Sequence, residues 1–177
     1  MSSSNNKVNS RIIIAFALMV ALAAGVTIAL RTTAFAAHAD DEAAVRAVLM
    51  ESATGFERGD LAVLNKVYAD DESVTIFESG HANYGWTDYR DHHLVPEMKE
   101  FKNTKYALSD IRVKVSGKTA WATFKYALSG DIKDRHIEVN GLGTAVLEER
   151  DGRWQIVHTH TSAPRRAPAA ANPAPKG

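Results

Sequence analysis

Four long segments rich in β-branched and aromatic residues fill the second half of the chain, and short turns join them. They cover residues 106–115, 119–128, 135–149 and 153–161. Ser-Gly-Lys at 116–118 and Asp-Gly at 151–152 are typical of tight hairpin turns, whereas residues 130–133 indicate a looser connection. Strands joined by hairpins pair antiparallel, so this half predicts a four-stranded meander. Gly141 and Gly143 lie inside one strand and predict a bend or bulge there.

Two helices are predicted ahead of the meander. The acidic residues 40–42 favour a helix start, and apolar residues then recur at helical spacing until Gly59. Asp60 can cap a second, short helix that ends near Tyr68.

A short strand and a third helix follow. Residues 72–78 alternate as a strand, and residues 80–85 turn the chain. The third helix runs from Thr87 toward Phe101, and Pro96 inside it predicts a kink or an early stop. The element order predicts an α+β domain in which one curved antiparallel sheet wraps around helices.

Residues 1–39 predict an export signal. The basic residues Lys7 and Arg11 precede an apolar run at residues 12–30. Small-residue cleavage sites follow at 34–36 and 37–39. The run is long enough to span a bilayer, so an uncleaved membrane anchor is the alternative. Both interpretations place the domain outside the cytoplasm, in the periplasm or the extracellular space.

Composition narrows the functional classes. Lys plus Arg and Asp plus Glu both number 21, so the formal net charge is zero, which argues against a basic nucleic-acid binder. Cysteine is absent, which excludes disulfides, thiolate zinc sites and cysteine nucleophiles. Residues 164–177 are rich in Pro and Ala without an apolar period and predict a disordered tail. The predicted domain is therefore residues 40–163.

The last predicted strand carries two histidines on one side. His158 and His160 share that side with Trp154 and Ile156, because strand side chains alternate, so we expect this side to face the interior. Residues spaced in this way stand about 7 Å apart and can converge on one point.

The third helix offers polar groups toward the same interior. His93 and Glu97 fall inside its apolar arc, one turn apart. Four aromatic side chains with polar tips add to this surface: Tyr84, Trp86, Tyr89 and Trp121. Aromatic walls with a few polar groups are typical of small-molecule pockets. The alternative is that the histidines are hydrogen-bonded residues of the sheet and the tryptophans belong to the core.

The element order and four stretches resemble the SnoaL-like group of the nuclear-transport-factor-2-like superfamily, which also contains ketosteroid isomerase. The stretches are ERGDLAVLNKVYADD, GWTDYRDHHLVPEM, TAWATF and DGRWQIVHTHTS. The resemblance covers residues 42–163. It implies a cone-shaped, strongly curved sheet closed by three helices, a cystatin-like α+β barrel with an interior pocket, usually in a homodimer. The superfamily includes isomerases, dehydratases, hydrolases and assembly domains, so the fold leaves the activity open.

The catalytic residues of ketosteroid isomerases are not matched. The resemblance implies an aspartate on the first strand, where residues 74–77 read Val-Thr-Ile-Phe and Glu78 is the nearest carboxylate. It also implies a tyrosine that donates a hydrogen bond to the oxyanion, and the matching position in this sequence is about Ser52. Steroid enolisation needs a base and oxyanion donors, so we do not predict that activity.

The first functional hypothesis is an exported domain that binds a small, mostly apolar molecule without a cofactor. We expect its pocket to be lined by Tyr84, Trp86, Tyr89, Glu97 and Trp121. If the protein is an enzyme, an isomerase-, lyase- or hydrolase-like reaction would use a histidine as general acid or base. The candidates are His158, His160 and His93.

Two alternatives stay open. A metal site for Zn or Cu would use nitrogen and oxygen donors. Its predicted ligands are His93, Glu97, His158 and His160. The other alternative is a structural homodimer without catalysis. None of the hypotheses includes a nucleic-acid partner, and a membrane is contacted only through residues 12–30 if they are not cleaved.

Overall fold

The computed structural model describes residues 38–164. Nearly all of the predicted export signal and of the predicted tail therefore lies outside the described residues. Among the residues that are described, no helix has the length and apolar character needed to cross a membrane. The fold is that of the compact unit that begins at Glu42.

Two helices open this unit as the sequence predicts. The N-terminal helix, residues 38–58, is followed by Gly59 with a φ of 66°, a backbone conformation that ends a helix without strain in glycine. Asp60 then accepts hydrogen bonds from two backbone N–H groups with its carboxylate and caps α2 (Leu61–Val67). Five apolar side chains of the two helices are buried: Val45, Leu49, Ala53, Leu64 and Val67.

The third helix begins one residue earlier than predicted and contains a wide turn. It consists of α3 (Trp86–Tyr89), the π-helical segment η1 (Arg90–Leu94) and α4 (Val95–Glu100). Pro96 lies in the first turn of α4, directly after η1. Proline lacks an N–H donor and collides with the carbonyl of the preceding turn, and a π turn accommodates both effects. The π turn therefore accommodates Pro96 without ending the helix, which continues to Glu100.

Six strands form one sheet in the order β2-β1-β6-β5-β4-β3. The strands are β1 (Thr75–Glu78), β2 (His81–Tyr84), β3 (Phe101–Ser116), β4 (Thr119–Ile132), β5 (Arg135–Arg150) and β6 (Arg153–Ser162). The pairing of β1 with β6 is parallel, and the other four pairings are antiparallel.

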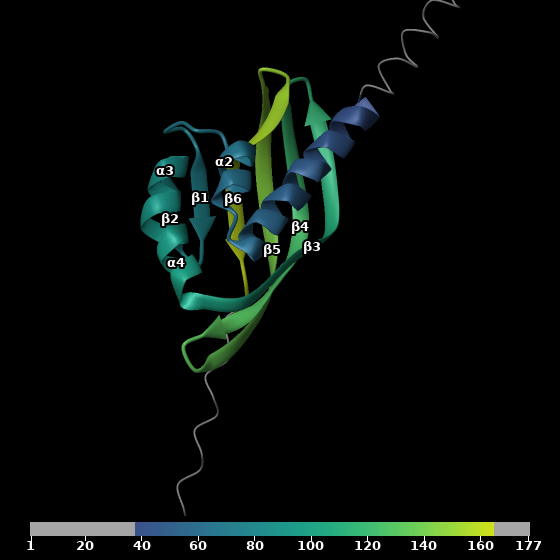
Figure 1. Ribbon diagram of the computed structural model, residues 1–177. Coiled ribbons are helices and arrows are strands. Elements are labelled where there is room, and N and C mark those ends of the chain that lie inside the picture. Colours follow the sequence, from purple (N-terminus) through teal and green to yellow (C-terminus); the bar gives the residue numbers. More distant parts are fainter. Residues whose placement is uncertain (1–37, 165–177) are drawn as a thin grey trace, which may run out of the picture. The chain divides into compact units, whose positions relative to one another are not determined.

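The predicted fold class is confirmed. Figure 1 shows a curved sheet with the N-terminal helix and α2 across one face and the third helix beside β1 and β2. The fold is α+β, and the sheet is open and mixed rather than purely antiparallel.

Two connections differ from the prediction. Residues 80–85 were expected to be a turn, but they contain β2, because Ser79 and Gly80 both adopt positive φ and close a two-residue hairpin. The connection between β4 and β5 is tight rather than loose, since Ile132 pairs with Arg135.

Of the bend or bulge expected at Gly141 and Gly143, the bulge is absent from the pairing with β4. The pairing of β4 with β5 continues without a shift through both residues. A Cβ atom at Gly141 would collide with the Tyr126 ring, and one at Gly143 with the Phe124 ring. The two glycines therefore make room for cross-strand aromatic rings.

Candidate functional site

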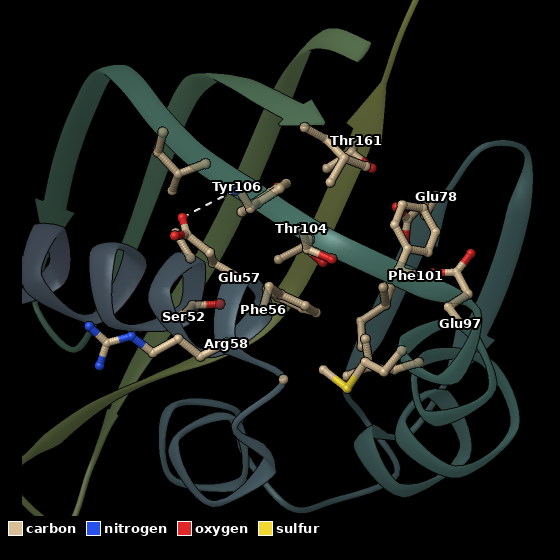
Figure 2. A pocket seen from close by; sticks show the side chains of 18 of the residues that line it. Ser52, Phe56, Glu57, Arg58, Glu78, Glu97, Phe101, Thr104, Tyr106 and Thr161 are labelled. Atoms are coloured by element: carbon tan, nitrogen blue, oxygen red, sulfur yellow. Dashed lines mark hydrogen bonds between the residues drawn. The ribbon is translucent and has the colours of Figure 1, made fainter. Parts of the chain in front are cut away.

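A cavity of about 340 Å³ lies against the inner face of the sheet. Figure 2 shows its side chains, which come from the N-terminal helix, the third helix and the sheet. Most of its wall is apolar and aromatic, with Phe56, Ile76, Met98, Phe101, Leu108 and Phe124 among the lining residues. A pocket of this size and character fits a small organic molecule.

Two glutamates lie together at one end of this cavity, next to Phe101 (Figure 2). Glu78 is the last residue of β1 and shares the inner face with buried Ile76, because strand side chains alternate. Glu97 comes from α4. The buried Tyr89 of α3 donates a hydrogen bond from its hydroxyl to Oε2 of Glu78, at 3.1 Å. We call Glu78, Tyr89, His93 and Glu97 the acidic pole.

His93 completes the acidic pole from the π-helical segment. Its Nε2 lies 3.5 Å from Oε1 of Glu97, one helical turn further along. Its Nδ1 lies 3.1 Å from Oδ1 of Asn83 on β2. Its ring packs against the ring of Tyr89, with centroids 5.1 Å apart. Contacts on three sides therefore fix the orientation of this imidazole.

Charge and burial change the acidity of the pole. Burial raises the pKa of the Glu97 carboxyl, the Glu78 carboxylate raises it further, and His93 acts in the opposite direction. Burial also raises the pKa of the Tyr89 hydroxyl well above its usual range, with Glu78 adding to the effect. Tyr89 is therefore a neutral hydrogen-bond donor, and Glu97 holds a proton more readily than a free glutamate.

The opposite end of the cavity is structural. There Glu57 accepts hydrogen bonds from the backbone N–H of Tyr106 at 3.3 Å and from Nζ of Lys105 at 3.2 Å (Figure 2). These contacts lower the pKa of Glu57 and hold the N-terminal helix against β3. The Glu57 carboxylate is thus held by the protein itself, whereas Glu78, Tyr89 and Glu97 of the acidic pole line the apolar space.

The expectation that His158 and His160 face the interior is wrong, and a β-bulge explains why. Val146 pairs with His158, whereas Leu147 pairs with Ile156. Val157 is therefore an extra residue on β6, and an extra residue shifts the alternation of all side chains that follow it.

After the bulge, threonines replace the histidines on the inner face. Thr159 is buried, and Thr159 and Thr161 both line the cavity. His158 and His160 instead pack edge-on against Phe77 on the outer face. Burial lowers the pKa of His158, whose Nδ1 lies 2.7 Å from Oγ1 of Thr75.

Three of the four predicted aromatic residues do not line the cavity. Trp121 is 47 % exposed on the outer face of β4, and Tyr84 is 64 % exposed on the edge strand β2. Trp86 belongs to the core: its ring stacks on Tyr68 at 4.3 Å and donates a hydrogen bond to Asn65. Tyr89 and Glu97, by contrast, do line the cavity.

The predicted metal ligands are divided between two faces of the sheet. His93 and Glu97 lie together, while His158 and His160 lie on the outer face. Glu78 instead joins His93 and Glu97, with donor atoms of all three within 4.8 Å of one another. Glu78 was recognised in the sequence as the nearest carboxylate, and its spacing of two from Ile76 is the signal that could have placed it in the site.

The chain is similar to proteins of known fold. A family model described as a SnoaL-like domain matches residues 45–166. No curated protein matches the chain. A solved structure described as a "putative ketosteroid isomerase" from Shewanella frigidimarina is 27 % identical, with a TM-score of 0.60, and the match covers 67 % of this chain and 94 % of that chain.

Two further structures share the fold at lower identity. A nuclear-transport-factor-2-like superfamily protein from Salmonella enterica is 15 % identical, with a TM-score of 0.63 and coverage of 71 % and 92 % of the two chains. The hexachlorocyclohexane dehydrochlorinase LinA-type3 from Novosphingobium barchaimii is 16 % identical, with a TM-score of 0.63 and coverage of 75 % and 92 %. Proteins of this family often bind small ligands or catalyse reactions of the isomerase or dehydratase type. This chain belongs to the family of SnoaL-like domain proteins, within the nuclear-transport-factor-2-like superfamily.

Proposed function

We propose that this protein binds a small, mostly apolar molecule in its cavity and moves a proton on it with Glu78 and Glu97. The observation that carries the proposal is the acidic pole, two carboxylates and a tyrosine hydroxyl at one end of an otherwise apolar cavity. An apolar wall holds the body of the ligand, and the few polar groups orient its reactive end.

Glu78 is the proposed base. Tyr89 holds one oxygen of its carboxylate, and this contact fixes the direction of the other oxygen toward a ligand in the cavity. Glu97 is the proposed acid, because burial and the Glu78 carboxylate raise its pKa, so that it holds a proton more readily than a free glutamate. Paired carboxylates in different environments can divide the roles of base and acid in this way.

His93 is the histidine that supports this chemistry. It contacts Glu97 and Tyr89, whereas His158 and His160 lie on the other face of the sheet. We assign His93 a positioning role, since it orients Glu97. An isomerase- or lyase-like proton transfer needs no cofactor beyond these side chains.

Ligand binding can be tested with the neutral fluorescent dye N-phenylnaphthylamine on the purified full-length protein. Leu108→Trp fills the cavity from β3, so we expect the dye signal to be lost. Leu142→Trp makes the same change at an exposed position outside this cavity and is the matched control. Equal dye binding by wild type and both variants would contradict binding in the cavity.

Proton transfer can be tested with a nitrobenzisoxazole. A carboxylate removes its ring C–H proton, the N–O bond breaks, and a coloured phenolate is released. We expect Glu78→Gln to lower the rate by about 10²-fold or more, while the exposed Glu72→Gln leaves it unchanged. A Glu78→Gln protein as fast as wild type would remove Glu78 as the base.

Two further properties are proposed from other residues. We propose export, based on the apolar run at residues 12–30 and the small residues that follow. We also propose a homodimer through the outer face of the sheet, because Trp121 and Leu142 are exposed there, at 47 % and 61 %. Large apolar side chains that lie exposed together mark interaction surfaces.

A further inference from the structure

The geometry points to a binding site for a divalent transition-metal ion at the acidic pole, with Glu78, His93 and Glu97 as its protein ligands. This inference goes beyond the proposed proton transfer and does not depend on it. It rests on the donor atoms, on the hydrogen bonds that orient them and on the charge of the pole.

The donor atoms are already close to the spacing that a metal ion requires. One ligand atom from each of the three residues lies within 4.8 Å of the other two. Nε2 of His93 and Oε1 of Glu97 are 3.5 Å apart, and metal–ligand bonds of about 2.1 Å place two tetrahedral ligands about 3.4 Å apart.

Hydrogen bonds fix the tautomer of His93 that a metal needs. The amide nitrogen of Asn83 donates to Asp88 at 3.1 Å, so the amide oxygen faces Nδ1 of His93. Nδ1 therefore carries a proton, and Nε2 is the ring nitrogen that lies toward Glu97, where it can give its lone pair to a metal ion in exchange for any proton it holds. Histidines that ligate metals commonly have their second ring nitrogen held by an acceptor in this way.

The charge of the acidic pole also favours a cation. Two carboxylates face a cavity with apolar walls. Among the described residues, every ion pair of a lysine or arginine is made with some other carboxylate. A divalent ion would neutralise both glutamates and would leave coordination positions open toward the cavity.

The donor set selects the class of ion. One imidazole nitrogen and two carboxylate oxygens suit Zn²⁺ and neighbouring first-row ions, whereas Mg²⁺ and Ca²⁺ prefer all-oxygen sites. With the ion absent, the pole accepts and donates protons, and with the ion bound it is a Lewis acid. The predicted ligands His158 and His160 play no part, since they lie on the outer face.

The test is a calorimetric titration of metal-free, full-length protein with Zn²⁺ alone, so its result is independent of any organic ligand. We expect one ion per chain with a micromolar or tighter Kd, and a visible spectrum for the Co²⁺ form typical of nitrogen and oxygen ligands. His93→Gln should lose most of the affinity. Asn83→Ala, which frees the histidine tautomer without removing a ligand, should lose about tenfold.

Two controls make the outcome decisive. His92→Gln changes the adjacent, exposed histidine and should bind Zn²⁺ as wild type does. A protein with both His158→Gln and His160→Gln should also be unchanged. Absence of Zn²⁺ binding by the wild type overturns the inference, as does equal affinity in the wild type and His93→Gln. If His93→Gln fails to fold, an Asn83→Ala protein with unaltered affinity and Co²⁺ spectrum overturns it instead.

Discussion

The hydroxyl of Tyr89 and the carboxylate of Glu78 are joined by a 3.1 Å hydrogen bond, and this contact ties the first turn of the third helix to the end of β1. Tyr89 is buried, and its hydroxyl lies at the wall of the cavity. The bond has a structural effect, because it joins two elements, and a chemical effect, because it fixes one oxygen of the proposed base.

Tyr89→Phe separates these effects. We expect the free energy of unfolding to fall by about 1 kcal/mol, the usual net value of one hydrogen bond. We also expect slower turnover of the nitrobenzisoxazole probe, because Glu78 is no longer held in place. Tyr84→Phe removes a hydroxyl from an exposed tyrosine and is the matched control for both measurements. A Tyr89→Phe protein that turns over the probe at the wild-type rate would show that the contact is structural only.

Glu97→Gln should make the protein more stable at neutral pH while slowing the probe reaction. Burial and Glu78 raise the pKa of Glu97 above its usual 4.5, so folding disfavours its ionised form. This penalty is absent well below pH 4.5 and is fully present above the raised pKa. The gain in Tm should therefore appear as the pH rises above 4.5.

The exposed Glu72→Gln, which lies outside the acidic pole, serves as the control for Glu97→Gln. Its Tm should follow that of the wild type at every pH. If Glu97→Gln shows the same gain in Tm at pH 4 and pH 7, the gain has a cause other than the ionisation of Glu97.

Arg150→Gln should lower the stability of the folded protein most at neutral pH and least in acid. Arg150 bonds to Asp71 and Glu148 and so fastens the segment before β1 to β5. The Ser73 hydroxyl and the Arg150 guanidinium lower the pKa of Asp71 from 3.8 to about 2. A lowered carboxyl pKa contributes stability above pH 3.8, and this contribution is lost as the pH falls toward 2.

Thermal unfolding of wild type and Arg150→Gln across this pH range measures that contribution. The Tm values of the two proteins should converge as the pH falls through about 2, because Asp71 becomes protonated in the folded wild type over that range. Arg153→Gln, on an exposed residue of the neighbouring strand, should follow the wild type throughout. A difference in Tm between wild type and Arg150→Gln that stays constant with pH would mean that Asp71 is not involved.

The sequence predicted the fold better than it predicted the site, and β6 shows the physical reason. Hydrophobic periodicity, caps and turns are local signals, and they located the helices and the four long strands. The bulge at Val157 arises in the pairing of β6 with β5, and the alternation of residues within β6 alone does not reveal it. One extra residue then moved two histidines to the outer face.

The residues of the acidic pole could also be predicted only in part from the sequence. His93 and Glu97 were predicted because they fall inside the apolar arc of a helix, whose spacing can be counted, and Tyr89 because it is an aromatic side chain with a polar tip. Glu78 comes from β1, and its approach to Glu97 depends on how the third helix packs beside the sheet. His93 lies on the π-helical segment, which directly precedes the helix that contains Pro96. This segment depends on Pro96 and on packing together, so the spacing of apolar residues alone does not predict it.

Trp121→Glu should convert the proposed homodimer to monomers. Trp121 lies in one row with Val146 and His158 across β4, β5 and β6, on the face opposite the cavity. A charge in the centre of an apolar contact remains desolvated without a partner, which disfavours association. Native mass spectrometry of the full-length protein measures the change, and dye binding in the cavity should persist.

Met50→Glu alters an equally exposed apolar residue on the N-terminal helix and should remain dimeric. Dissociation by Met50→Glu but not by Trp121→Glu would move the interface from the sheet to the helix.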